Sequence, residues 1–98
     1  MTQKKKNNKL TPLTKQYYSV KDQYSDSLVL FRMGDFFETF DNDAKDISRI
    51  LGITLTKRAN GAASEVPLAG FPHHSLDVYL PKLVSAGRRI AICEQVED

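Results

Sequence analysis

The segment that decides the fold is LVLFRMGDFFETF, residues 28–40. Its first four residues form a short apolar run with β-favouring side chains, which predicts a strand in the centre of a sheet. The RMGD that follows is a turn signal, because Gly34 permits a tight turn and a close approach of the backbone. The last five residues predict a second strand. Alternation places Phe36, Glu38 and Phe40 on one of its faces, and Phe37 and Thr39 on the other.

Helical patterns flank this segment on both sides. Before it, Thr11-Pro12 combines a hydroxyl N-cap with a proline at the first helical position, which predicts a helix from about Pro12 to Tyr24. The residues expected on its buried face are Leu13, Tyr17, Val20 and Tyr24. Those expected to face solvent are Lys15, Lys21 and Asp22.

After the segment, a second helix is predicted from Asp41 to Leu51. Asp41 is the expected N-cap, Asp43 favours the positive end of the helix dipole, and Gly52 stands where a glycine commonly ends a helix. The expected apolar face consists of Ala44, Ile47, Ile50 and Leu51.

Further strands are predicted at residues 53–56 and 88–95. A polar loop at residues 57–65 is expected to follow the first of these strands and to lead into a short edge segment at residues 66–70. The segment at 66–70 is placed at an edge because Pro67 cannot donate to a ladder. A third helix is predicted from a Ser75 cap to about Gly87, with Pro81 expected to bend it or delay its start. Its expected buried face is Leu76, Tyr79, Leu80, Leu83 and Val84.

The predicted order of elements is α-β-β-α-β-(β)-α-β. This order indicates an α/β fold, with a mixed β-sheet and helices packed against it. The 98 residues suffice for one domain. We expect residues 11–98 to form this domain, truncated at the C-terminus, and residues 1–10 to form a disordered basic tail.

The net charge of +2 depends on four lysines near the N-terminus, and the remaining chain is slightly acidic. A strongly basic nucleic-acid-binding module is therefore excluded, and any contact with DNA must come from a local patch or a larger assembly. The single cysteine, Cys93, excludes an internal disulfide. We expect it to be a buried, inert thiol, and the absence of a disulfide fits a cytoplasmic protein. The sequence has no membrane-spanning apolar stretch, no signal peptide and no phosphate-binding loop.

The most distinctive group in the sequence is an aromatic ring and a carboxylate two residues apart, Phe36 and Glu38, beyond the Gly34 turn. A ring can act as a wedge between base steps, and a carboxylate beside it can accept a hydrogen bond from a base edge. The residues themselves leave a plainer alternative open, with Phe36 in the core and Glu38 on a solvated strand.

Other polar groups are also ambiguous. Magnesium prefers carboxylates, so a nuclease site is one interpretation of an acidic cluster in the sequence. The simpler interpretation is that these residues cap the second helix. The cluster consists of Asp35, Glu38, Asp41 and Asp43. Lys57-Arg58 is either a phosphate contact or a solvated surface. His73-His74 and Arg88-Arg89 are expected to be surface residues, and without a third ligand the histidines do not indicate zinc.

The chain resembles the N-terminal mismatch-recognition domain of the MutS family over almost all of residues 11–95. The motifs that carry the resemblance are Thr11-Pro12, Gln16-Tyr17, FRMGDFFETF (31–40), Asp43-Ala44, LTKR (55–58), PLAGFPHH (67–74), Tyr79-Leu80, Lys82-Leu83-Val84 and AICEQ (91–95). Two departures are Phe37, where many relatives carry tyrosine, and Pro81 within the third helix.

The resemblance implies residue roles that the pattern alone does not establish. Phe36 would stack against a mispaired base from the minor groove, and Glu38 would hydrogen-bond to that base. Arg58 would contact the DNA backbone, and Met33 and Leu68 would pack near the lesion. The partner would be mismatched double-stranded DNA.

The resemblance also implies a larger protein, whose later domains bind ATP and magnesium, form a homodimer and contact MutL. This fragment itself would hold no cofactor or metal and have no catalytic site. Two alternatives from other classes are a metal-dependent nuclease built on the acidic cluster and a protein-interaction module with an aromatic docking patch.

Overall fold

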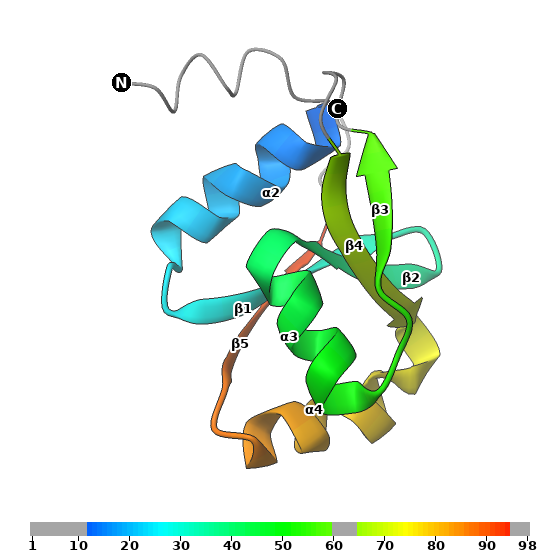
Figure 1. The fold of residues 1–98 in the computed structure, drawn as a ribbon. Coiled ribbons are helices and arrows are strands. Elements are labelled where there is room, and N and C mark those ends of the chain that lie inside the picture. The colour runs from blue at the N-terminus through cyan, green and yellow to red at the C-terminus, as the bar shows by residue number, and fades with distance from the viewer. Residues whose placement is uncertain (1–11, 60–64, 95–98) are drawn as a thin grey trace.

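A computed structural model describes residues 12–59 and 65–94 of the chain. The expected basic tail, the Thr11 cap, residues 60–64 of the expected polar loop and the residues after Glu94 lie outside this part. Five strands form one mixed sheet in the order β3-β4-β2-β1-β5 (Figure 1). They are β1 (Ser27–Met33), β2 (Phe36–Phe40), β3 (Thr56–Ala59), β4 (Glu65–Pro72) and β5 (Arg89–Glu94).

The pairing of the strands confirms the predicted mixed sheet. Strand β5 runs parallel to β1, whereas β1–β2, β2–β4 and β3–β4 are antiparallel. The helical elements are α2 (Pro12–Gln23), α3 (Asp41–Leu51), the 3₁₀ turn η1 (His73–Ser75) and α4 (Leu76–Ser85). The order of elements along the chain is the predicted one, and β1 is an interior strand as expected.

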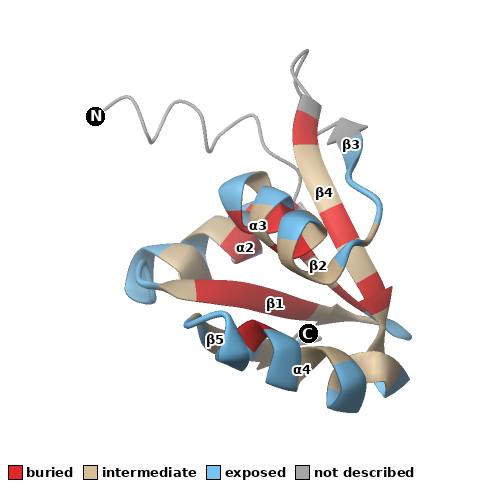
Figure 2. Cartoon of the chain, turned by 60° about the horizontal axis from the view of Figure 1, so that its bottom comes forward, coloured by how far each residue is buried: buried red, intermediate tan, exposed pale blue. Residues whose placement is uncertain are grey.

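Each face of the sheet has its own hydrophobic cluster. On one face, α3 and α4 contribute Ala44, Ile47 and Leu83, which pack with Phe37 and Phe71. On the other face, Tyr17 of α2 packs with a second cluster: Val29, Phe31, Phe40 and Val66. Strand β1 is buried between them along most of its length (Figure 2). The continuous apolar run at residues 28–31 follows from this burial on both faces.

Helix α3 ends as predicted, with Gly52 in the left-handed conformation and its N–H donating to the Ser48 carbonyl. Ala44 and Ile47 are buried, and Ile50 and Leu51 pack beside them. The prediction that Asp41 is the N-cap is wrong. Phe40 occupies that position, and Asp41 follows it with φ of +59°.

Two strand predictions need correction. Residues 53–55 are not a strand, and pairing begins only at Thr56, so that Lys57 and Arg58 lie in β3 rather than in a loop. The Ile53 carbonyl instead accepts a hydrogen bond from the Ser48 hydroxyl at 2.6 Å. The segment around Pro67 is not an edge, because β4 lies between β3 and β2. Pro67 lies one residue beyond the last register pair with β2 and is opposite Lys57 of β3.

The helix predictions are corrected in detail. Helix α2 ends at Gln23, and Tyr24 lies beyond it with its side chain exposed. Lys21, expected to face solvent, is half-buried and paired with Asp43. Ser75 occupies the N-cap position of α4 without a capping side-chain hydrogen bond, and α4 continues through Pro81. Val84, expected in its buried face, is exposed.

Candidate functional site

The β1–β2 hairpin places Phe36 directly after a two-residue turn. Met33 and Phe36 are register partners, and Gly34-Asp35 connects them. Gly34 has φ of +57°, a conformation that glycine adopts without steric cost. Arg32 Nε donates to the Gly34 carbonyl at 2.7 Å, and the His73 N–H donates to the Asp35 carbonyl at 2.7 Å. The turn is therefore held from both sides, which fixes the position of Phe36.

Phe36 and Glu38 share one face of the sheet with their cross-strand partners. Opposite residues in an antiparallel ladder point to the same face, as do residues two apart along a strand. Phe36 lies between Met33 and Pro72, and Glu38 between Phe31 and Gly70. The face is the one that α2 covers, because Phe40, two residues further, packs against Tyr17 with ring centroids 5.1 Å apart.

Burial falls along this face from Phe40 to Phe36. Phe40 is 0% exposed, Glu38 is half-buried, and Phe36 is 45% exposed. Helix α2 covers the end of β2 that leads into α3 and leaves the hairpin end open. The core interpretation of Phe36 is therefore incorrect, and the ring is accessible to a partner.

The other predicted site residues lie at different distances from this ring along the face. Met33 is its register partner and is half-buried against the second cluster. Leu68 is also half-buried, but it is opposite Phe40 and not Phe36. The backbone of Arg58 pairs with Val66 in β3, and the Arg58 side chain lies outside the described part of the structure.

The acidic cluster separates into side chains with different surroundings. Asp43 is buried, and Asp41 accepts a hydrogen bond from the Tyr18 hydroxyl at 2.7 Å. Asp35 is exposed in the turn. Within residues 12–59 and 65–94, no group of three His, Cys, Asp or Glu side chains could hold a metal ion. This arrangement gives the nuclease interpretation no support.

The basic pairs also differ from one another. Lys57 is exposed on β3. Arg88 pairs with Asp46, and Arg49 donates to the same carboxylate at 2.9 Å. Burial raises the pKa of the Asp46 carboxyl, but the two guanidinium groups outweigh it and hold the pKa below its ordinary value. Arg88 is therefore a structural residue.

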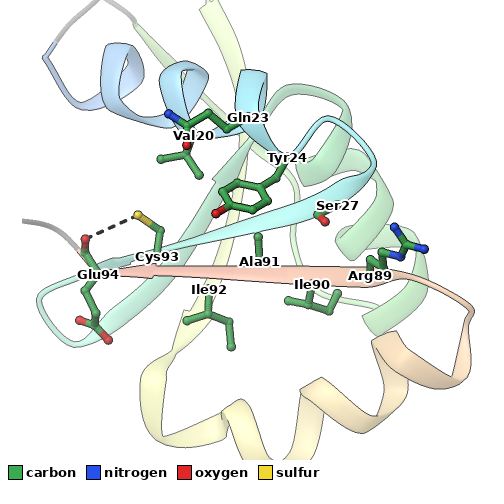
Figure 3. Close-up of a pocket in the computed structure, with 10 residues that line it drawn as sticks. All are labelled: Val20, Gln23, Tyr24, Ser27, Arg89, Ile90, Ala91, Ile92, Cys93 and Glu94. Carbon is green, nitrogen blue, oxygen red and sulfur yellow. Dashed lines mark hydrogen bonds between the residues drawn. The ribbon is translucent and has the colours of Figure 1, made fainter.

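A groove runs along edge strand β5 under the end of α2 (Figure 3), with the Tyr24 ring over Ala91. None of the five predicted site residues is among the described residues that line it. Cys93 lies in the groove wall and is half-buried rather than buried as expected. Burial, followed by the charge of Glu94, raises the pKa of its thiol, which disfavours the reactive thiolate.

Two features of the site escaped sequence reasoning. The Arg32 side chain holds the turn through its hydrogen bond to the Gly34 carbonyl, and no sequence pattern indicates this contact. Gly70 lies opposite Glu38 at a close approach of the two strands. A glycine inside a strand is itself a signal of close approach, and this one stands in the PLAGFPHH motif.

Residues 11–98 match the family model described as MutS domain I. The chain belongs to the MutS family. It is similar to proteins named DNA mismatch repair protein MutS from several bacteria. Identity is 64% over 88 residues with that of Salinibacter ruber, which covers 90% of this chain and 10% of the relative. With that of Porphyromonas gingivalis, identity is 65% over 88 residues, again 90% of this chain and 10% of the relative.

The relative from Flavobacterium johnsoniae is 60% identical over 98 residues, which is 100% of this chain and 11% of that protein. The chain thus spans about a tenth of the length of the curated MutS relatives it matches. The mixed sheet and packed helices described above are the fold of this MutS domain I. Among its described helices, none is long and apolar enough to cross a membrane.

Proposed function

We propose that this chain recognises mismatched and unpaired bases in duplex DNA, as the first domain of a mismatch-repair ATPase. The observation that carries the proposal is the 45% exposed ring of Phe36 at the open end of the hairpin, on the same face as Glu38. Large aromatic side chains are usually buried, so a half-exposed ring held on a rigid turn favours a role in binding.

The ring acts as a wedge in this mechanism. An apolar side chain pushed between base steps from the minor groove unstacks them and kinks the duplex, which costs a few kcal/mol per step. A mismatched pair stacks and pairs poorly, so the same kink costs less there. The protein therefore responds to how easily DNA deforms and not to its sequence, and one site serves many different mismatches.

Glu38 adds discrimination beside the wedge. Its carboxylate is repelled by phosphates and gains a hydrogen bond only where a base edge presents a hydrogen or the carboxyl takes up a proton. A matched pair buries those edges in its own pairing. The carboxylate thereby disfavours matched DNA more than it favours the lesion.

The remaining site residues take supporting roles. Met33, the register partner of Phe36, and Leu68 supply apolar surface near the lesion. Arg58 contacts the DNA backbone and sets the register on the duplex. The described chain is not strongly basic, so most of the affinity for DNA comes from the rest of the protein.

The whole protein is, by this proposal, a cytoplasmic homodimer that contacts MutL and hydrolyses ATP with magnesium in later domains. The chain itself has no phosphate-binding loop and performs recognition without catalysis. No residue of this domain is assigned a role in binding ATP.

The direct test is the variant Phe36→Ala in a full-length MutS protein that carries this sequence as its domain I. Stacking of a base on an aromatic ring contributes about 1–3 kcal/mol, so the ratio of mismatched to matched affinity should fall roughly 5- to 150-fold. The measurement is equilibrium competition between the two duplexes at fixed salt, since DNA affinity depends strongly on salt.

The matched control is Ile92→Ala. Ile92 is 44% exposed, close to the value for Phe36, and lies on edge strand β5. This variant should keep the affinity ratio of the parent protein. A Phe36→Ala protein that is folded and still prefers mismatched DNA as strongly as the parent contradicts the proposal.

A further inference from the structure

Gly70 of β4 lies so close to β2 that a side chain cannot be added without displacing neighbouring atoms. A Cβ built on Gly70 would meet the Phe37 carbonyl oxygen at 2.6 Å, Glu38 Cγ at 3.1 Å and Glu38 Cα at 3.4 Å. The first of these atoms belongs to the backbone, which cannot rotate away as the end of a flexible side chain can.

The reason for glycine at this position is space and not backbone conformation. Gly34, Gly52 and Gly87 have positive φ angles, and a Cβ on each of them would meet nothing within 4 Å. Gly70 is the reverse, since its φ lies outside the left-handed region and its Cβ position is crowded. Among the described glycines, Gly70 alone has a crowded Cβ position, and its neighbour Glu38 belongs to the proposed recognition site.

The two shortest contacts of the Gly70 Cβ position, with the Phe37 carbonyl oxygen and Glu38 Cγ, both affect the position of Glu38. Gly70 and Glu38 are register partners, so their side chains would compete for one site on the same face. The Glu38 side chain occupies that site itself, because its Cγ lies where it would contact a Gly70 Cβ. The Phe37 carbonyl belongs to the peptide group that leads into Glu38. A side chain at position 70 would therefore shift the carboxylate through both its backbone and its own Cγ.

We propose that Gly70 is a positioning residue that sets where the Glu38 carboxylate meets the DNA base. This inference rests on the proposed role of Glu38 in mismatch recognition. Phe36 is opposite Pro72, and none of the three atoms nearest to the Cβ position of Gly70 belongs to Phe36. Substitution at position 70 therefore changes discrimination by the carboxylate and leaves the wedge in place.

The experiment is a double-mutant cycle of Gly70→Ala and Glu38→Ala in the full-length protein. Glu38→Ala should lower the ratio of mismatched to matched affinity roughly tenfold, the size of a hydrogen bond made by a charged group. Gly70→Ala should lower it by a similar factor, and the double variant should lower it no further. Non-additivity of this kind separates a residue that acts through Glu38 from one that acts independently.

A matched control is Gly52→Ala, which places an alanine in a strained backbone conformation with φ of +73° at the end of α3. It should reduce the stability of the domain and leave the affinity ratio unchanged. An unchanged ratio in Gly70→Ala overturns the inference while the proposed function stands. Losses that add fully in the double variant also overturn it, because they indicate that Gly70 acts independently of Glu38.

If Glu38→Ala alone has no effect, both the carboxylate role and this inference fail. If Gly70→Ala does not fold, a crystal structure of the parent protein on a mismatched duplex decides. The inference requires Glu38 Cγ in van der Waals contact with Gly70 while the carboxylate reaches the lesion. A side chain turned away from β4 in that complex overturns it.

Discussion

The Tyr17 hydroxyl donates a 2.7 Å hydrogen bond to Asp43 Oδ2 in the interior of the domain. The same carboxylate accepts from the Val29 N–H at 3.1 Å and from Lys21 Nζ at 3.1 Å, so one side chain of α3 joins α2 to β1. The Phe40 carbonyl oxygen lies 3.0 Å from the Tyr17 hydroxyl and is a second acceptor for its single hydrogen. These bonds hold α2 over the Phe40 end of the sheet, and its position there leaves Phe36 exposed.

The first prediction concerns this buried carboxylate. Asp43→Ala should lower the free energy of unfolding by about 3 kcal/mol or more, because several buried donors lose their acceptor at once. Tyr17→Phe should cost about 1 kcal/mol, the net contribution of an ordinary hydrogen bond. Urea denaturation measures both, with Lys15→Ala at an exposed site as the control. Equal effects of Asp43→Ala and Lys15→Ala would show that the carboxylate does not hold the helices together.

Alkaline pH provides a second prediction. Burial, the charge of Asp43 and the hydrogen bond to it raise the pKa of Tyr17 far above its ordinary value of 10.0. Burial and the hydrogen bond to Asp41 raise the pKa of Tyr18. A raised folded-state pKa contributes stability that is fully present below the unfolded pKa and is lost as the pH rises above it.

Stability should therefore fall above about pH 10, by up to ~1.4 kcal/mol per pH unit for each tyrosine whose pKa remains higher in the folded state. Tyr17→Phe should make this slope shallower. Denaturation series at several alkaline pH values measure it. Identical slopes in the parent and the variant contradict the assigned environment of Tyr17.

Acid pH tests the ion pair between Asp46 of α3 and Arg88, the residue that precedes β5. Because the pKa of Asp46 is lowered from 3.8, its contribution is present above that value and is lost as the pH falls below it. The Asp46 side chain is 29% exposed, so the pair with Arg88 should contribute only about 1 kcal/mol at neutral pH. Arg88→Ala should show this deficit at pH 7 and little deficit near pH 2. A constant deficit at both pH values would assign the effect to packing.

The charge of Glu38 yields a prediction that is separate from its position. Glu38→Gln keeps the length of the side chain and removes its repulsion from phosphates. Matched duplex should therefore bind more tightly to the variant, and the ratio of mismatched to matched affinity should fall. Binding of each duplex at the same salt concentration measures both quantities. Unchanged affinity for matched DNA would mean that the carboxylate does not face the duplex.

The hairpin could be predicted because its signals are local. An apolar run, a glycine turn and an alternating segment suffice to place β1, the turn and β2. The strand expected at residues 53–56 was misplaced because a tertiary contact intervenes. Ile53 is apolar and β-branched, but its carbonyl accepts a hydrogen bond from the Ser48 hydroxyl, and the residue belongs to no strand.

Relationships across long stretches of sequence could not be predicted. The pairing of Glu38 with Gly70 depends on a register between strands about thirty residues apart, and no local pattern sets it. The side chain of Asp43 presented the same problem. Its place in the first turn suggested only a dipole effect, whereas its partners come from α2 and β1. The exposure of Phe36 likewise depends on how far α2 extends over the face of the sheet that carries Phe36.

The stacking of the Phe36 ring on a mispaired base is the central claim, and photo-crosslinking tests it most directly. A duplex with 5-iodouracil at the mismatched position is bound to the full-length protein and irradiated, and the crosslinked peptide is identified by mass spectrometry. The crosslink should map to Phe36 and disappear in Phe36→Ala. A crosslink that maps outside the β1–β2 hairpin, with equal yield in Phe36→Ala, would contradict the claim.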